Sequence, residues 1–207
     1  YRRITKLGRD EDGSILVNLE SGLYDGMPQG DFDVILDRES HNPGEKIMEK
    51  LTAGVYLGEL GRLMLRAAAD EGLLSAGSAE HVRALGRIDA SVIDAWASGE
   101  QLDLAADNAD DADFAQTMSL ELFRRSAQCM CANLAGIMLL TGAGDDAARP
   151  VCVCAEGSLV DRSRHFRPML EELLNEYAAG RLGKHAVLRV SRETTLPGSA
   201  AAALLNR

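Results

Sequence analysis

The stretch NPGEKIMEKLTAGVYLGELGRLML, residues 42–65, has the pattern of a long amphipathic helix. Asn42 is a suitable helix N-cap, and Pro43 is tolerated in a first turn because that position needs no amide hydrogen. The sequence predicts one helix over residues 42–71, with Gly72 as its C-terminal stop. Apolar side chains recur mostly at spacings of three and four and predict a core-facing stripe of Ile47, Leu51, Val55, Leu60, Leu63, Met64 and Ala67.

Four residues in this helix are not needed to anchor it. Glu49 lies amid apolar side chains, although it is in line with further polar residues that form a polar face at helical spacing. Gly54, Gly58 and Gly61 lack a Cβ atom and therefore permit close approach of another chain segment or a ligand. We interpret Gly58 and Gly61 as packing positions and expect Glu49 and Gly54 to have a role in function.

The rest of the chain predicts an α/β domain with a parallel sheet. VCVCA at 151–155 is typical of a strand, and a Gly-Ser turn and a helix over 164–179 that stops near Gly180 follow it. HAVLRVS at 185–191 begins a similar unit, with a second Gly-Ser turn and a helix from 198. Two such strand-loop-helix units favour parallel strands with ligands at their carboxyl ends. Further expected elements are strands at 4–7 and 14–20, short helices within 79–100, a solvated acidic linker at 104–113 and a long helix over 114–140.

Length and charge restrict the class of protein. A chain of 207 residues suits one main domain, and its net charge of −10 argues against a nucleic-acid partner. No segment approaches the roughly 18 consecutive apolar residues of a membrane span, so we expect a cytoplasmic protein without membrane contact. Because the chain starts at Tyr1 inside a strand-like segment, we expect it to begin partway through a longer protein.

The cysteines and histidines do not predict a metal site. Cys129 and Cys131 lie in a helical pattern, where residues two apart point away from each other, so we expect buried free thiols there and at Cys152 and Cys154. The signatures of a P-loop kinase and of a common zinc protease are both missing. Gly157-Ser158, between a strand and a helix, offers amide hydrogens and a hydroxyl suited to a phosphate, a pattern that ordinary turns also show.

Four segments together resemble the eukaryotic-type hexokinase family. VNLESGLY at 17–24 and LDRESHNPGEKIMEK at 36–50 are similar to its sugar-binding motifs, N-x-E-W-G-A-F and LDE-S-x-NPG-x-x-x-x-EK. AGVYLGELGRLML at 53–65 resembles the helix that follows, and VCVCAEGSLV at 151–160 resembles the V-D-G-S nucleotide loop.

This resemblance implies an α/β fold of the ribonuclease-H-like, actin-like ATPase type, with residues 1–207 as the large C-terminal lobe of hexokinase without its N-terminal lobe. It implies ATP- and Mg²⁺-dependent phosphorylation of a glucose-like hexose at the 6-hydroxyl. Glu20 and Glu49 would bind the sugar, Gly157 and Ser158 the ATP phosphates, and Gly54 would lie near the nucleotide. The catalytic Asp of the family precedes Tyr1, so no catalytic residue is expected in this chain and the chain alone is expected to be inactive.

Departures from the family pattern leave two other functions open. Ser21 replaces the usual Trp, Glu156 stands where Asp is expected, and LPGSAAAALL at 196–205 lacks the family's lysine. One alternative is a non-catalytic hexokinase-like sugar-binding or sensor protein, and another is an acidic α/β domain whose likeness is only historical. The sequence does not indicate the preferred hexose, the regulation or the oligomeric state.

Overall fold

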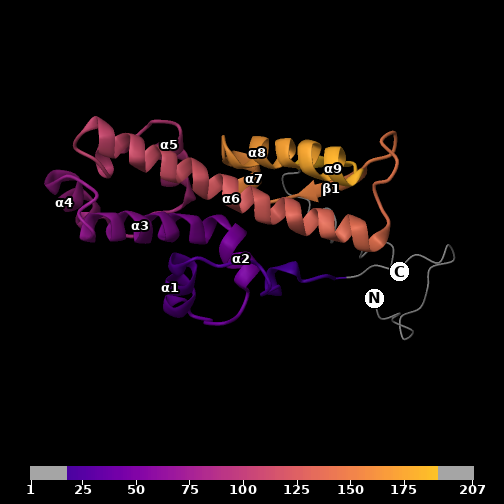
Figure 1. Ribbon diagram of the computed structural model, residues 1–207, viewed down its shortest axis with the longest axis horizontal. Helices are drawn as coiled ribbons and strands as arrows, with labels where there is room; N and C mark the ends of the chain where they lie inside the picture. Colours follow the sequence, from indigo (N-terminus) through magenta and orange to yellow (C-terminus); the bar gives the residue numbers. More distant parts are fainter. Residues whose placement is uncertain (1–17, 191–207) are drawn as a thin grey trace, which may run out of the picture.

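A long helix, α6 (Ala109–Thr141), runs across the molecule (Figure 1). The structure is a computed structural model that describes residues 18–190. Its helices are α1 (Asp31–Glu39), α2 (Ile47–Thr52), α3 (Gly54–Asp70), α4 (Ala76–Ala84), α5 (Ala90–Ala97), α6 (Ala109–Thr141), α7 (Ser158–Arg162), α8 (Phe166–Leu173) and α9 (Gly180–Leu182). Shorter elements are the 3-10 turns η1 (Ser21–Leu23) and η2 (Leu102–Leu104), the π-helical turn η3 (Leu174–Ala179), and the strands β1 (Val151–Ala155) and β2 (Ala186–Val190).

Helix α6 begins earlier than the sequence predicted, because the acidic segment before it is not a solvated linker. Asn108 caps the helix by accepting a hydrogen bond from the Asp111 amide at 2.9 Å, which starts α6 at Ala109 instead of residue 114. Asp107 accepts hydrogen bonds from the hydroxyls of Ser75 and Ser78 at 2.7 and 2.8 Å. The expected linker therefore ties α6 to the start of α4.

The predicted helix over 42–71 is wrong at residues 42–46 and at Ala53, whereas residues 47–52 and 54–70 are helical. Residues 42–46 form a turn, because Asp37 accepts the Gly44 amide at 2.9 Å and Lys50 Nζ donates to the Asn42 carbonyl at 2.8 Å. An extended residue, Ala53 (φ −84°, ψ 138°), then separates α2 from α3.

The break at Ala53 also changes which side chains of the predicted stripe are buried. Of the predicted stripe, Ile47, Leu51 and Leu60 are buried but Val55 is 64% exposed. Leu57 and Leu65, which were not in the predicted stripe, are at most 1% exposed and belong to the core. Beyond α3, Gly72 has φ +70°, which confirms the predicted stop.

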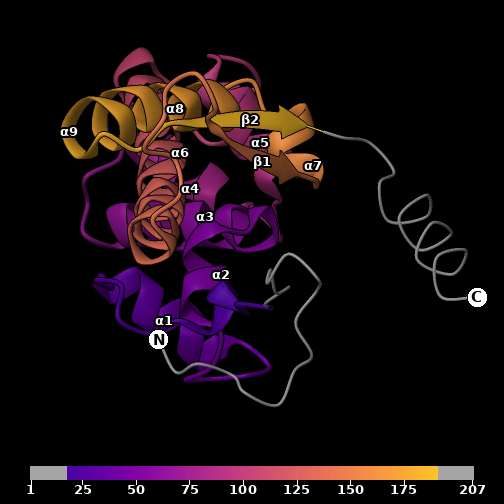
Figure 2. The same ribbon diagram turned by 90° about the vertical axis from the view of Figure 1, so that its right-hand side faces the viewer.

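The two strands of the described sheet are parallel, as predicted, with Val151 opposite Ala186 (Figure 2). Val151, Ala186 and Leu188 pack against the core. Cys152 and Cys154 are exposed and Cys129 is half-buried, so the expectation of four buried thiols holds only for Cys131. The helix after β1 is also interrupted and ends at Gly183 (φ +63°) instead of Gly180. The predicted strand at 4–7 and the helix from 198 lie outside the described residues, as does most of the strand at 14–20, of which residues 18–20 have no regular structure.

The core lies between α3, α5, α6 and α8. Trp96, on α5, and Phe123, on α6, are fully buried, which agrees with short helices around the tryptophan. Gly61 allows α3 to approach α5, since a Cβ atom there would lie 2.6 Å from Ile93 Cδ1. Gly58 faces the backbone of Ile88 in the same way, so both glycines are packing positions, as interpreted. Among the helices of residues 18–190, none combines the length and apolar character needed to span a bilayer.

Candidate functional site

The structure brings the two predicted sugar-binding carboxylates to neighbouring elements. Glu20 precedes η1, and Glu49 lies on α2, which packs against η1. The Met48 amide donates to the Tyr24 carbonyl at 3.0 Å and joins the two segments. A Cβ atom on Gly22 would lie 3.4 Å from Glu49 Cβ, so this glycine permits the close approach.

Lys46 forms an ion pair with one of these carboxylates, Glu49. Its Nζ lies 3.1 Å from Glu49 Oε2, and the Glu49 hydrogen bond, together with the charges of Glu49 and Glu20, raises the pKa of Lys46. Lys46 and Glu20 both have left-handed backbones, with φ of 54° and 47°, a conformation that costs free energy outside glycine and is frequent at functional sites. The Asn18 amide donates to Glu20 Oε1 at 2.6 Å. Both carboxylates are partly exposed acceptors of the kind that binds sugar hydroxyls.

The predicted phosphate-binding residues lie where β1 meets α7. Gly157 has φ +129°, a conformation that favours glycine, and Ser158 is the first residue of α7. Gly54, at the start of α3, is nearby: a Cβ atom there would lie 3.7 Å from Leu159 Cβ and 3.4 Å from Ala90 Cβ. The structure therefore brings Gly54 together with the Gly157-Ser158 turn, although the two are about a hundred residues apart in the sequence.

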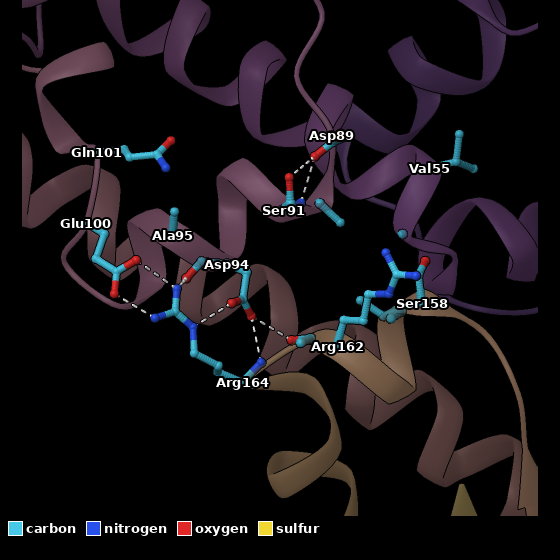
Figure 3. A pocket seen from close by; sticks show the side chains of 14 residues that line it. Val55, Asp89, Ser91, Asp94, Ala95, Glu100, Gln101, Ser158, Arg162 and Arg164 are labelled. Atoms are coloured by element: carbon cyan, nitrogen blue, oxygen red, sulfur yellow. Dashed lines mark hydrogen bonds and ion pairs between the residues drawn. The ribbon is translucent and has the colours of Figure 1, made fainter. Parts of the chain in front are cut away.

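Two cavities meet at these residues. The larger, of 710 Å³, is lined by the start of α3, by α5 and by α7, and it includes Gly54 and Ser158 (Figure 3). The smaller, of 480 Å³, is lined by residues that include Thr52, Ala53, Gly54, Gly157 and Ser158. Both volumes fall in the range of small-molecule sites.

Charged groups line one side of the larger cavity. Asp94, on α5, is 8% exposed and accepts hydrogen bonds from Ser163 and Arg164 (Figure 3). Burial alone would raise the pKa of Asp94, but these hydrogen bonds outweigh it and lower the pKa. Asp89, at the N-cap of α5, accepts the Ser91 amide at 2.8 Å, and hydrogen bonds from Ser91 lower the pKa of Asp89.

Sequence reasoning missed this charged group. The segment Arg162-Ser163-Arg164 begins four residues after Ser158 and was a usable signal for cationic groups near the turn. Nothing in the sequence pairs it with Asp94, because that residue lies about seventy positions upstream in an otherwise apolar helix.

Within residues 18–190 no three side chains of His, Cys, Asp or Glu gather into a metal-binding group. Magnesium commonly binds nucleotides through phosphate oxygens and water with only one or two carboxylates, so the arrangement is compatible with Mg²⁺ that arrives with ATP.

Comparison with known proteins establishes the family. The family model described as hexokinase matches residues 1–205. The chain belongs to the hexokinase family. This hexokinase-family chain is 28% identical over 210 residues to hexokinase-7 of Oryza sativa subsp. japonica, covering 92% of the chain and 45% of the rice protein. It is 30% identical over 243 residues to the glucokinase of Aspergillus niger, covering 98% of the chain and 48% of that protein. The chain thus spans about half the length of these relatives.

Solved hexokinase structures establish the fold. A crystal structure of hexokinase superposes with a TM-score of 0.68 at 22% identity, covering 85% of this chain and 41% of that one. Hexokinase from Schistosoma mansoni complexed with glucose gives a TM-score of 0.64 at 19% identity, covering 78% of this chain and 38% of that one. The expected family and the actin-like, ribonuclease-H-like fold are confirmed. The roles of Glu20, Glu49, Gly54, Gly157 and Ser158 stay predictions.

Proposed function

We propose that residues 1–207 are the large C-terminal lobe of an ATP-dependent hexose kinase that phosphorylates the 6-hydroxyl of a glucose-like sugar. The observation that carries this proposal is the 480 Å³ cavity, which borders both the end of α2, at Thr52, and the Gly157-Ser158 turn. Glu49 lies one turn before Thr52 on the same helix. The helix that carries a predicted sugar ligand therefore leads directly to the predicted phosphate-binding turn.

Each residue has a defined role in this proposal. The carboxylates of Glu20 and Glu49 accept hydrogen bonds from sugar hydroxyls and so fix the orientation of the ring. The amides at Gly157 and Ser158 and the Ser158 hydroxyl donate to phosphate oxygens, and Gly54 leaves room beside them. Bound Mg-ATP supplies the phosphoryl group, and transfer depends mainly on positioning and charge stabilisation.

The base that accepts the proton of the sugar hydroxyl is proposed to belong to the N-terminal lobe of the same protein. The proposal therefore predicts that the isolated chain binds ligands but does not turn them over. A cytoplasmic location is part of the same prediction.

The test is ADP release from Mg-ATP with a panel of hexoses, measured on this chain and on the protein extended to its natural N-terminus. Hexose-dependent activity confined to the extended protein is the expected result. In the extended protein, Glu49→Gln should raise the KM for the sugar by about tenfold or more, the equivalent of one hydrogen bond to a charged group. Glu45→Gln is the matched control, because Glu45 is an exposed carboxylate in the preceding turn.

Two outcomes would contradict the kinase proposal. Sugar binding without ADP release in the extended protein would favour the alternative, a non-catalytic sugar-binding or sensor protein, which the departures at Ser21 and in LPGSAAAALL at 196–205 also favour. If neither hexose nor Mg-ATP at about a hundredfold Kd raised the melting temperature, where binding stabilises by about 2.7 kcal/mol, both functions would be excluded.

A further inference from the structure

Asp94 makes an unusual set of contacts for a carboxylate in the wall of a cavity. All of them go to the short segment that follows α7. Oδ1 accepts the Ser163 hydroxyl at 2.8 Å and the Arg164 amide at 2.9 Å, and Oδ2 accepts Arg164 Nε at 2.9 Å (Figure 3). Both oxygens are thus occupied, and the side chain is 12% exposed.

The Arg164 guanidinium extends this contact to a third segment. Its NH1 and NH2 groups donate to the two carboxylate oxygens of Glu100 at 2.6 and 3.1 Å. One arginine therefore connects α5 with the loop after α5. These charge-assisted, planar contacts hold the geometry more strictly than a lysine could.

The position of α7 depends on these contacts. Helix α7 has five residues, of which Ser158 is the first, and Ser163 is its C-cap. Strand β1 fixes the chain before α7, and Asp94 fixes it immediately after. Ser158 and Asp94 line the same 710 Å³ cavity, so a shift of α7 away from α5 changes the width of that cavity and the position of the Ser158 hydroxyl.

We propose that Asp94 is a positioning residue for nucleotide binding, which holds α7 and Ser158 at the correct distance from α5 through Ser163 and Arg164. This inference rests on the proposed nucleotide site and adds to it a residue that does not itself touch the phosphates. Because both of its oxygens are occupied by donors from residues 163–164, Asp94 can stand in the wall of an anion-binding cavity without an uncompensated charge.

The experiment compares Asp94→Asn with the parent in the protein extended to its natural N-terminus. Asparagine keeps the size of the side chain but places an NH₂ group where Oδ2 accepts Arg164 Nε. The KM for Mg-ATP should rise roughly 10- to 100-fold, as expected for a misplacement of up to about 1 Å, while the KM for the hexose stays within about twofold. Hydrogen exchange at the Arg164 amide should become faster in the unliganded protein.

Two further variants separate positioning from a general loss of structure. Asp146→Asn is the matched control, because Asp146 also accepts one backbone amide, from Ala148, and one Arg Nε, from Arg149, but lines none of the cavities described above. It should leave both KM values unchanged. Arg164→Lys keeps the positive charge but loses the planar guanidinium that donates to both Asp94 and Glu100. It should also raise the KM for Mg-ATP selectively, but by less than Asp94→Asn.

The outcomes distinguish this inference from the proposed function. If the parent protein binds Mg-ATP and Asp94→Asn binds it equally well, the positioning role is wrong and the nucleotide site stands. An equal rise of both KM values would also overturn the inference, because it would indicate general destabilisation. If the parent protein does not bind Mg-ATP at all, the proposed function itself fails, and the inference fails with it.

Discussion

Asp111 at the start of α6 should make the stability of this protein depend on pH in a defined window. Its carboxylate accepts the Ser75 amide at 3.0 Å and the Asn108 side-chain amide at 2.6 Å. Burial alone would raise the pKa of Asp111, but hydrogen bonds from Ser78, Ser75 and Asn108 lower it from an ordinary 3.8 to about 2. This difference corresponds to about 2 kcal/mol of stability at neutral pH.

The sign follows from the direction of the shift. A carboxyl group with a lowered pKa in the folded state contributes its stabilisation above the unfolded pKa and loses it as the pH falls through the folded pKa. The contribution of Asp111 should therefore be complete at neutral pH and decline between about pH 5 and about pH 2. In Asp111→Asn the group cannot titrate, so the difference in unfolding free energy between the two proteins should shrink by about 2 kcal/mol over that range.

Urea denaturation at a series of pH values measures this difference. Asp110→Asn serves as the control, because Asp110 is an exposed carboxylate one residue away and should change the unfolding free energy by less than about 0.5 kcal/mol. A constant free-energy difference between Asp111→Asn and the parent at every pH would refute the reasoning. It would show that Asp111 stabilises the fold, if at all, independently of its charge.

Two further substitutions test packing and a half-buried ion pair. Gly58→Ala should destabilise the fold by about 1–3 kcal/mol, because the added Cβ atom would collide with the backbone of the α4–α5 connection. By contrast, Gly136→Ala should stabilise the fold by up to about 1 kcal/mol, because Gly136 is helical and no atom lies within 4 Å of the added Cβ. Arg125→Met should cost about 2 kcal/mol in urea denaturation, since it removes two hydrogen bonds of 2.7 and 2.8 Å from Asp33, which is 4% exposed. Arg124→Met, on the exposed side of the same helix, should lower the unfolding free energy by less than about 1 kcal/mol. An equal loss of unfolding free energy in the two variants would contradict a specific stabilisation by the Arg125–Asp33 ion pair.

The sequence predicted the elements whose signals are local. The strand at 151–155 and the stop at Gly72 follow from apolar runs and from glycine, and both are found. The turn at 42–46 could not be predicted, because it depends on tertiary contacts with Asp37 and Lys50. The break at Ala53 has no local signal either, because alanine favours helix. The start of α6 was missed for the opposite reason: the run of acidic residues concealed Asn108, a cap with a strong local signal.

The candidate site was predictable where its residues lie in segments that match the sequence motifs of the family. The resemblance named Gly54 and Ser158 separately, and the structure adds that they line the same cavity. Asp94 and Arg164 were out of reach, because a pair about seventy residues apart has no signature in a single sequence. Such pairs appear only once the fold brings the segments together.

The unbroken length of α6 has a consequence for how this protein can change during evolution. Its 33 residues span about 50 Å and contact α2 and α3 as well as α5 and α8. One inserted or deleted residue near its middle rotates everything beyond it by about 100°, which turns buried positions such as Ala135 and Met138 away from the core. Substitutions within α6 are accommodated one at a time, but length changes are not. Insertions and deletions among related proteins should therefore be confined to connections such as residues 143–150, and α6 should keep a constant length.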